Sequence, residues 1–507
     1  YDYIVPLLGA VAAGGAASPS NPAYTPTELA YQVEATKAKV MIAHVSNIDI
    51  AVKAAEMVGL PKSSILIFGN ETVDGIRPFR QALFSDKPGS PVELTPEEAE
   101  THVAYLCFSS GTTGKSKGVM TTHLNIIANI LQFHMLDKDF INERDRIIGV
   151  LPFYHIYGLV LVLHCSIYFG TQVYVLPRFH LETLCRTIQD NKITLAYLVP
   201  PILLQLAKNP SIPNFDLSSL REIMSGAAPL GDDLSKQLKA RLPNTILRQS
   251  YGLTETSPAA VIEPTHDVVL GSSGFLLSNM SAKVVNEEGR EVKQGERGEL
   301  WLKGPNIMKG YLNNLEATND CIDSESYFHT GDVAVYDENE RFYIVDRIKE
   351  LIKYKGFQVP PAEIEAILVC SLKMKLKSPI VSDCAVIGVY DKNQATELPR
   401  AYIVLKDGIP KSAKSENEIK KFVADQVVHY KQLRSVKFIN EIPKSPSGKI
   451  LRRLLRDSAA KEQEQEEEYI LSLEKLEKGI KLKAYDDLLL LIKLNYGITP
   501  VLKGSEK

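Results

Sequence analysis

The first 270 residues alternate between short apolar runs and segments of helical periodicity. Runs rich in β-branched and aromatic residues predict buried strands at 41–44 (MIAH), 64–69 (SILIFG), 172–177 (QVYVLP) and 194–200 (TLAYLVP). Between the last two, residues 180–192 (HLETLCRTIQDNK) place apolar side chains at helical spacing. Strands that alternate with helices form parallel sheets whose faces the helices cover. This pattern predicts an α/β fold.

The pattern changes in the second half of the chain. Residues 281–304 contain short alternating strands with glycine turns, which predict a small antiparallel or barrel-like module. From about residue 350 a mixed α/β pattern returns over a length typical of a second, smaller domain. Residues 461–483 are rich in charge, with apolar residues at helical spacing, and predict a helix.

The N-terminal stretch, YDYIVPLLGAVAAGGAAS (1–18), has the apolar run and small residues of a signal peptide. It lacks a basic start, and Asp2 stands where a signal peptide carries positive charge. We therefore expect a buried helix that packs through its small residues.

Composition bounds the classes of function. A chain of 507 residues is too long for one compact core, so two or more domains are expected. A net charge of -3 implies no strong attraction to nucleic acid or anionic lipid. The six cysteines are scattered, as in proteins with reduced thiols, and the apolar run 488–494 is too short to cross a bilayer. With no peroxisomal C-terminal tripeptide, we expect a cytoplasmic protein, as a monomer or homodimer, without a nucleic-acid partner.

Residues 109–118 (SSGTTGKSKG) are close to a nucleotide-binding P-loop, but Ser109 stands where the first glycine belongs. Apolar residues at 103–108 and 118–120 predict a strand on each side, and the next helix start comes near Thr121 or Thr122. A P-loop instead runs straight into a helix. The segment is thus either a strand–loop–strand phosphate loop, with glycines, hydroxyls and lysines facing an anion, or an ordinary polar hairpin.

Two further segments carry a carboxylate beside other polar groups. YGLTET (251–256) places an aromatic ring, a hydroxyl and a carboxylate where they could stack a base, contact a phosphate and hold Mg²⁺. The same residues could instead begin a capped helix. In HTGD (329–332), Asp332 follows a glycine turn and could bond ribose hydroxyls, or simply form the turn.

Basic residues concentrate in two places near the C-terminus. Arg347, Lys349, Lys353 and Lys355 lie within nine residues, and a solvated basic helix face is the usual explanation for such a run. PKSPSGKILRR presents Lys449 in a Gly-Lys turn preceded by prolines. Each signal alone is modest.

Taken together, SSGTTGKSKG, LPFYHIYGL, SGAAPL, YGLTET, HTGD, DRIKELIKYKGFQV and PKSPSGK resemble the acyl-adenylate-forming superfamily, in the same order along the chain. That superfamily includes acyl-CoA synthetases, beetle luciferases and peptide-synthetase adenylation domains. The similarity is greatest to 4-coumarate–CoA ligases and their fungal relatives, and extends to about residue 456.

The resemblance implies an ATP-dependent acid–thiol ligase with ATP, Mg²⁺ and CoA as its cofactors and a small carboxylic acid as substrate. The acid would attack the α-phosphorus of ATP, and CoA would then displace AMP from the acyl-adenylate. The alternatives are a luciferase-like oxygenase that uses the same adenylate and a nucleotide-binding relative without turnover. The implied organisation is a large N-terminal domain of parallel sheets with a β-barrel-like module at 1–346, a hinge at 347–349, a mobile α+β C-terminal domain at 350–460 and a charged helical tail at 461–507.

The resemblance also assigns site residues. Those expected around the nucleotide are Ser109, Ser110, Gly111, Thr112, Thr113, Gly114, Lys115 and Lys117 at the β- and γ-phosphates, Thr254 at the α-phosphate, Glu255 at Mg²⁺, Ala227, Ala228 and Tyr251 at adenine, and Asp332 and Arg347 at the ribose. Those expected to act in the chemistry are His155 beside the carboxylate, Lys449 between carboxylate and α-phosphate, Lys349 as the hinge, Gly356 beside pantetheine, and Lys353 and Gln358 facing the adenylate after domain rotation. The expected acyl pocket consists of Tyr157, Leu161, Pro200, Ile202, Ala227 and Ser250.

Several features depart from the family pattern. Ser250 stands where relatives have glycine, so a side chain there should narrow or polarise the acyl pocket. Relatives have more chain ahead of residue 1, which suggests an incomplete N-terminal domain with weakened stability or dimer contacts. The stretch 370–384 is longer than in relatives, and the tail after about 460 has no recognised counterpart. A mostly apolar pocket favours an aromatic propenoate or a medium-chain fatty acid over acetate.

Overall fold

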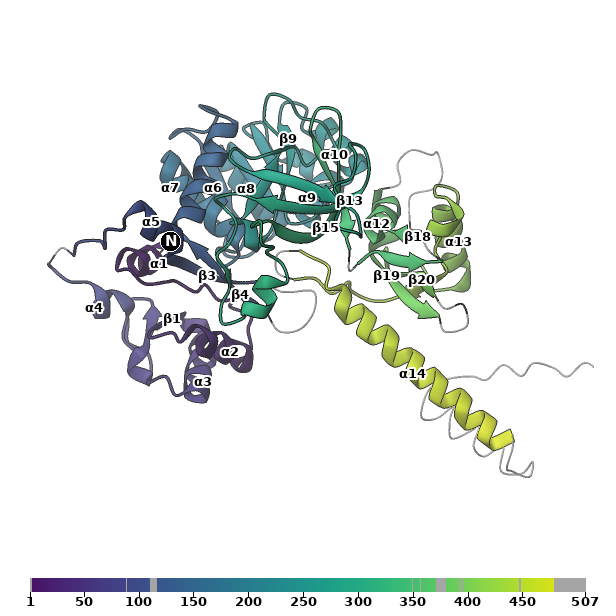
Figure 1. Ribbon diagram of the computed structural model, residues 1–507, viewed down its shortest axis with the longest axis horizontal. Helices are drawn as coiled ribbons and strands as arrows, with labels where there is room; N and C mark the ends of the chain where they lie inside the picture. Colours follow the sequence, from purple (N-terminus) through teal and green to yellow (C-terminus); the bar gives the residue numbers. More distant parts are fainter. Residues whose placement is uncertain are drawn as a thin grey trace, which may run out of the picture.

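The computed structural model describes residues 2–87, 89–109, 116–348, 350–355, 357–370, 380–391, 394, 396–445 and 448–477. Figure 1 shows a large lobe built from the first two-thirds of the chain and a smaller lobe at its C-terminal side. The mixed α/β fold with a large N-terminal and a smaller C-terminal part is confirmed.

The main sheet of the large lobe has, in the described part of the chain, seven strands with a parallel centre. Its strands in spatial order are β11 (Phe275–Leu276), β10 (Ala259–Ile262), β9 (Ile246–Gly252), β8 (Glu222–Ser225), β7 (Leu195–Leu198), β5 (Arg146–Gly149) and β6 (Gln172–Val175). All residues of β7 and β8 are buried, as expected for central parallel strands covered on both faces. The strand predicted at 194–200 is shorter than expected, because Pro200 begins a helix.

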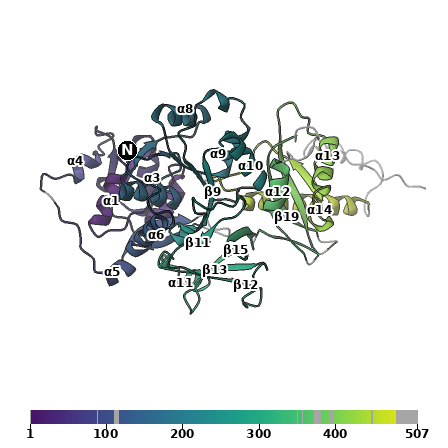
Figure 2. The same cartoon turned by 90° about the horizontal axis from the view of Figure 1, so that it is seen from above.

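Helices of the large lobe pack around this sheet and around the smaller sheets beside it (Figures 1 and 2). They are α1 (Ile4–Ala12), α2 (Pro26–Thr36), α3 (Ile48–Val58), α4 (Phe79–Leu83), α5 (Pro96–Thr101), α6 (His123–Leu136), α7 (Cys165–Phe169), α8 (Leu181–Asn191), α9 (Pro200–Lys208), α10 (Asp232–Arg241) and α11 (Leu315–Asn319). Thr122 caps α6 in a reciprocal pair with Asn125, so the expected helix start is confirmed.

Smaller sheets complete the large lobe. Strands β1 (Met41–His44) and β2 (Ile65–Phe68) pair in parallel, and β3 (Val103–Ser109), β4 (Lys117–Thr122) and β14 (Gly310–Tyr311) form an antiparallel sheet. The antiparallel module predicted after residue 270 is a sheet of β12 (Ser281–Val285), β13 (Gly298–Lys303), β15 (Phe328–Tyr336) and β16 (Phe342–Arg347).

The smaller lobe has its own hydrophobic core. Its sheet consists of β19 (Val381–Asp391), β20 (Thr396–Leu405) and β21 (Ser435–Phe438), packed against α12 (Pro361–Cys370) and α13 (Ala413–Ala424). A hairpin of β17 (Ile352–Tyr354) and β18 (Phe357–Val359) lies beside this sheet. Helix α14 (Arg452–Glu477) begins on the lobe and extends away from it (Figure 1).

The two lobes touch along one side of α12. Figure 2 places α10 beside α12, and a Cβ built on Gly231 would lie 3.5 Å from Ala366. The Asp346 carboxylate, at the end of the large lobe, accepts a 3.0 Å hydrogen bond from the Ala362 backbone N–H of the smaller lobe. The lobes therefore meet directly next to the expected hinge.

Two local predictions are wrong. Helix α1 does form, but it packs through its large residues: Leu7 is buried in the core, whereas Gly9 and Ala12 are exposed. Small residues bury too little apolar area to determine which face of a surface helix packs against the core. The basic segment 347–355 is not a helix; it ends β16 and forms β17, so Lys353 projects from a strand.

The helix predicted at 461–483 is present as far as Glu477 and starts earlier than expected, at Arg452. Within the described residues, no helix combines the length and the apolar character that crossing a bilayer requires.

Candidate active site

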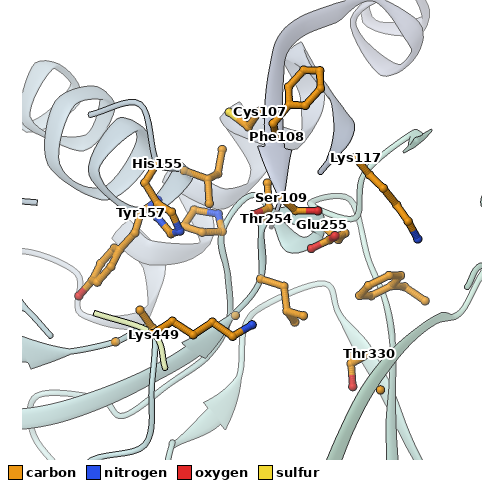
Figure 3. A pocket seen from close by; sticks show the side chains of 18 of the residues that line it. Cys107, Phe108, Ser109, Lys117, His155, Tyr157, Thr254, Glu255, Thr330 and Lys449 are labelled. Atoms are coloured by element: carbon orange, nitrogen blue, oxygen red, sulfur yellow. The ribbon is translucent and has the colours of Figure 1, made fainter. Parts of the chain in front are cut away.

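A cavity of about 730 Å³ opens where the sheets of the large lobe meet the smaller lobe. Its walls come from segments far apart in sequence, including the ends of β3 and β9, the strand β15 and the loop before α14 (Figure 3). Predicted site residues that line it are Ser109, Lys117, His155, Tyr157, Leu161, Ala227, Ser250, Tyr251, Thr254, Glu255, Arg347 and Lys449.

The residues on either side of the expected phosphate loop, Ser109 and Lys117, line this cavity. Ser109 closes β3, Lys117 opens β4, and the two are paired across the antiparallel ladder, as the strand–loop–strand interpretation predicts. The residues between them that were assigned to phosphate, Ser110, Gly111, Thr112, Thr113, Gly114 and Lys115, lie outside the described residues. The Lys117 ammonium lies 4.6 Å from the centre of the Tyr311 ring.

Thr254 and Glu255 follow β9 in a single 3₁₀ turn. Glu255 is buried, its Oε1 accepts a 2.9 Å hydrogen bond from the Tyr311 hydroxyl, and its backbone carbonyl accepts one from Met308 N–H. One carboxylate oxygen is thus held by the protein while the residue lines the cavity. A single carboxylate beside a phosphate loop fits Mg²⁺, which takes few carboxylates together with phosphate and water oxygens.

Tyr251 on β9 and the paired residues Asp332 on β15 and Arg347 on β16 form a hydrogen-bonded group that joins two sheets. The Tyr251 hydroxyl donates to Asp332 Oδ2 over 2.7 Å, and Arg347 Nε lies 3.0 Å from Asp332 Oδ1. Burial raises the pKa of Asp332, and the charge of Arg347 and the bond from Tyr251 partly counter that rise. Carboxylate lone pairs that remain free can accept ribose hydroxyls.

The glycine before Asp332 does not make a turn. Gly331 lies inside β15 with a φ of 70°, a left-handed conformation that favours glycine. Its N–H donates to Glu299 Oε1 over 2.9 Å, and Thr330 Oγ1 accepts the Asp332 N–H. The local twist of the strand, rather than a turn, aims Asp332 at Tyr251 and Arg347.

His155 and Lys449 line the cavity from the two different lobes (Figure 3). Burial, together with the smaller effect of the positive charge of Lys449, lowers the pKa of His155 to about 4. The imidazole is therefore neutral at pH 7. Burial also lowers the pKa of Lys449, as does Arg347, while nearby carboxylates, among them Glu350, oppose the shift.

A tight loop presents Lys449. Its backbone N–H donates to Ser445 Oγ over 3.1 Å and its carbonyl accepts the Ser445 N–H over 2.8 Å. Gly448 has a φ of 81°, and a Cβ there would lie 3.1 Å from Pro201 of the large lobe. The glycine thus allows the loop to turn and to approach the other lobe closely.

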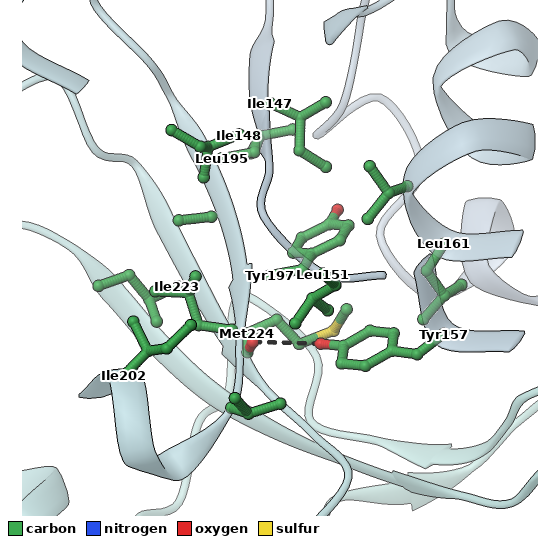
Figure 4. Packing of buried hydrophobic residues seen from close by; sticks show 14 of the residues in the cluster. Ile147, Ile148, Leu151, Tyr157, Leu161, Leu195, Tyr197, Ile202, Ile223 and Met224 are labelled. Atoms are coloured by element: carbon green, nitrogen blue, oxygen red, sulfur yellow. Dashed lines mark hydrogen bonds between the residues drawn. The ribbon is translucent and has the colours of Figure 1, made fainter. Parts of the chain in front are cut away.

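The apolar end of the cavity is formed by Tyr157 and by Leu161 from the π-helical segment Gly158–His164 (Figure 4). The Tyr157 hydroxyl donates to the Met224 carbonyl over 3.2 Å, which fixes the ring. Ser250 Oγ donates to the Ser225 carbonyl over 3.3 Å. The serine hydroxyl is therefore held by backbone at the cavity wall.

Other predicted residues lie elsewhere. Pro200, Ile202, Ala228 and Asp332 do not line the cavity among the described residues; Ile202 packs in the core below it (Figure 4). Lys353 is exposed on β17 and absent from the cavity wall. Lys349, Gly356 and the Gln358 side chain lie outside the described residues.

Sequence reasoning missed Tyr311, Glu299, His329 and Ser445. Tyr311 and Glu255 are 56 residues apart, and nothing in the local pattern of GYLNN indicates their contact. Tyr311 lies in a strand, β14, of which only two residues pair with β4. A strand this short leaves no recognisable pattern in the sequence.

A cavity between two lobes, lined by the two strand ends Ser109 and Lys117, the carboxylate of Glu255, Tyr251 and Arg347, and a lysine from the smaller lobe, fits an adenylate-forming acyl-CoA ligase. The chain belongs to that family. The model of the family described as AMP-binding enzyme matches residues 1–312, and the model described as AMP-binding enzyme C-terminal domain matches residues 363–449. The resemblance inferred from the motifs is thereby confirmed.

Individual proteins extend this result. The chain is 38% identical over 465 residues to 4-coumarate–CoA ligase 3 of Oryza sativa subsp. japonica. The match covers 90% of this chain and 80% of that protein. Its fold is similar to that of ATP-bound MatB from Rhodopseudomonas palustris, with a TM-score of 0.79, 28% identity, and coverage of 90% and 86%. It is also similar to Bacillus subtilis O-succinylbenzoate–CoA synthetase (MenE) in complex with ATP and magnesium, with a TM-score of 0.68, 26% identity, and coverage of 85% and 82%.

Proposed function

We propose that this chain activates an aromatic propenoate, in the manner of a 4-coumarate–CoA ligase, as an acyl-adenylate and transfers the acyl group to CoA. The observation that carries the proposal is the placement of Lys449, from the smaller lobe, in one cavity with His155, Thr254 and Glu255. That arrangement brings a mobile cation to the place where two anions must meet.

In the first step, a carboxylate oxygen of the acid attacks the α-phosphorus of ATP. The bond from that phosphorus to the bridging oxygen breaks, and pyrophosphate leaves. Both reactants are anionic, so the protein contributes mainly alignment and charge neutralisation. Lys449 lies between the acid and the α-phosphate, Thr254 donates to the α-phosphate, and Lys117 neutralises the departing phosphates.

Glu255 is the residue that would hold Mg²⁺, which would neutralise charge on the phosphate oxygens. The buried carboxylate with one oxygen fixed by Tyr311 fits this role, and a relative of similar fold binds ATP together with magnesium. Arg347 holds the ribose from the cavity wall, with Asp332 buried directly behind it, and Tyr251 and Ala227 border the adenine.

In the second step, the smaller lobe rotates about the hinge at Lys349. Lys449 withdraws, and Lys353, Gln358 and Gly356 take its place around a path for pantetheine. The CoA sulfur attacks the acyl carbonyl, the carbonyl–oxygen bond to AMP breaks, and the thiol proton is lost to solvent or to a base. Lys353 is exposed and lies outside the cavity, as expected if the two lobes are arranged for the first step.

The acid would lie at the apolar end of the cavity, against Tyr157 and Leu161, with its carboxylate toward His155. Because His155 is neutral at pH 7, it can donate one hydrogen bond to the acid without adding charge. A medium-chain fatty acid is the second candidate substrate class, since the same wall is apolar.

The test measures the exchange of labelled pyrophosphate into ATP across a panel of cinnamic acids and medium-chain fatty acids, with acyl-CoA formation assayed in parallel. We expect exchange with cinnamic acids and thioester formation only when CoA is added. No exchange with any acid would refute adenylate formation, and light emission with luciferin and O₂ would favour an oxygenase.

Two lysine variants separate the half-reactions. Lys449→Ala should lower exchange by at least ~100-fold, as expected for loss of a charge that stabilises the transition state, while it still converts supplied acyl-adenylate to thioester. Lys353→Ala should show the opposite pattern. If both variants lose both activities equally, the proposed division between two poses is wrong.

A further inference from the structure

Tyr311 contacts both charged groups at the phosphate end of the cavity. Its hydroxyl donates to Glu255 Oε1 over 2.9 Å, and the Lys117 ammonium lies over its ring, 4.6 Å from the centroid. The tyrosine is buried in a small apolar cluster and also lines the cavity. One side chain therefore sits between the anion and the cation that face the phosphates.

The backbone of Tyr311 is fixed independently of these contacts. It pairs with Val119 on β4, two residues after Lys117, and its N–H donates to Thr318 Oγ1 over 2.9 Å. The ring thus has a rigid base on the same sheet that carries the phosphate loop. Glu255 belongs to a different segment, the 3₁₀ turn after β9, and the hydroxyl bond joins that turn to the sheet.

We infer that Tyr311 is a positioning residue for the metal–phosphate end of the site. By holding Oε1, it orients Glu255 so that the other oxygen faces the cavity, and through its ring it holds Lys117 beside the phosphate loop. Groups that orient a metal-binding side chain in this way contribute strongly to metal affinity. This inference rests on the proposed function, because Glu255 is the proposed holder of Mg²⁺.

The experiment measures binding of a non-cleavable ATP analogue, α,β-methylene-ATP, by calorimetry in the presence of Mg²⁺ and again in EDTA. The ratio of the two affinities reports what the metal contributes. Tyr311→Phe removes only the hydroxyl and keeps the ring under Lys117. We expect it to reduce the ratio ~10-fold and to leave the affinity in EDTA unchanged.

Three further variants test the cause. Glu255→Gln should reduce the ratio at least as much, and adding Tyr311→Phe to it should cause no further loss, because the hydroxyl acts through this carboxylate. Tyr311→Leu removes the ring as well and should also weaken binding in EDTA through Lys117. Tyr105→Phe is the matched control: it removes a buried hydroxyl that bonds His164 over 2.8 Å outside the cavity, and it should behave as the unmodified protein.

Equal loss of affinity with and without Mg²⁺ in Tyr311→Phe would mean a purely structural role and overturn the inference, as would additive losses in the double variant. The outcome for the proposed function is separate. If the unmodified protein binds the analogue no more tightly with Mg²⁺ than in EDTA, the metal site itself is refuted before any Tyr311 variant is compared.

Discussion

Asp346 joins the two lobes directly before the hinge, which makes its ionisation a test of the domain motion. The residue ends the described part of the large lobe on β16 and is 6% exposed. Its Oδ1 accepts the Arg347 N–H over 2.8 Å, and its Oδ2 accepts the Ala362 N–H at the start of α12 over 3.0 Å. In the proposed rotation of the smaller lobe, α12 would move away and leave this carboxylate in water.

The magnitude follows from the environment of the carboxylate. Burial raises its pKa to about 6; Arg452 on α14 and the two backbone N–H groups oppose the rise, and Glu350 adds to it. In water, the pKa returns to about 3.9. The packed pose therefore binds the proton ~100-fold more tightly than the rotated pose, which corresponds to about 3 kcal/mol.

The sign is set by which pose holds the proton. Because the packed pose has the higher pKa, acidification favours it, and the gain develops as the pH falls from about 6 to about 4. Above pH 6 the carboxylate is ionised in both poses, and the balance no longer changes through this group. Thus the packed pose, which is the proposed adenylate-forming pose, should be enriched ~50-fold at pH 4 relative to pH 7.

Fluorescence energy transfer between dyes on the two lobes, recorded from pH 4 to pH 8 without substrates, measures this change. Asp346→Asn should remove most of the pH dependence between 4 and 6. Asp337→Asn is the matched control, because its carboxylate lies on the β15–β16 turn, bonds only residues of that turn and of β16, and loses the same charge. Identical pH profiles for the unmodified protein and Asp346→Asn would refute the reasoning.

Three further predictions concern the large lobe. The His155 ring proton signal should titrate near pH 4 by NMR, and Lys449→Met should raise this pKa because it removes a neighbouring positive charge. Gly226→Ala would place a Cβ 2.8 Å from the Tyr157 ring, so the KM for the acid should rise more than the KM for ATP, at a cost to stability of about 1–3 kcal/mol in urea unfolding. Arg248→Met leaves two buried carboxylates unpaired and should lower the free energy of unfolding by about 3–5 kcal/mol, measured the same way.

Part of the main sheet could be predicted, because strands β6 and β7 and the helix α8 between them are specified by their own residues. β7 is apolar over its whole length, and α6 begins at its threonine cap. The segment 347–355 failed the same test, since charge density alone indicated a helix. Its alternating residues, Ile352 and Tyr354 buried with Lys353 exposed between them, show the period of two that a strand requires.

The site was predictable where its residues lie in motifs, whether several on one segment or singly, as with His155 and Lys449. YGLTET supplies Tyr251, Thr254 and Glu255 together, and all three line the cavity. Tyr311 and Asp346 act through single contacts between segments that are distant in sequence or belong to different lobes. Such contacts depend on how sheets and lobes pack, and one sequence contains no periodicity that encodes them.

The position of Lys449 explains why a cation for the first step belongs on a mobile lobe. Burial and Arg347 both lower the pKa of its ammonium, so the group is held in the cavity against desolvation and like charge. Triphosphate and carboxylate offset that cost while both are bound, but the departure of pyrophosphate removes most of the compensating negative charge. A lysine fixed to the large lobe would then remain buried beside Arg347 and occupy the approach to the acyl carbonyl. The proposed rotation would return the ammonium to water and open that approach, so the electrostatic change produced by the first step would itself favour the pose for the second.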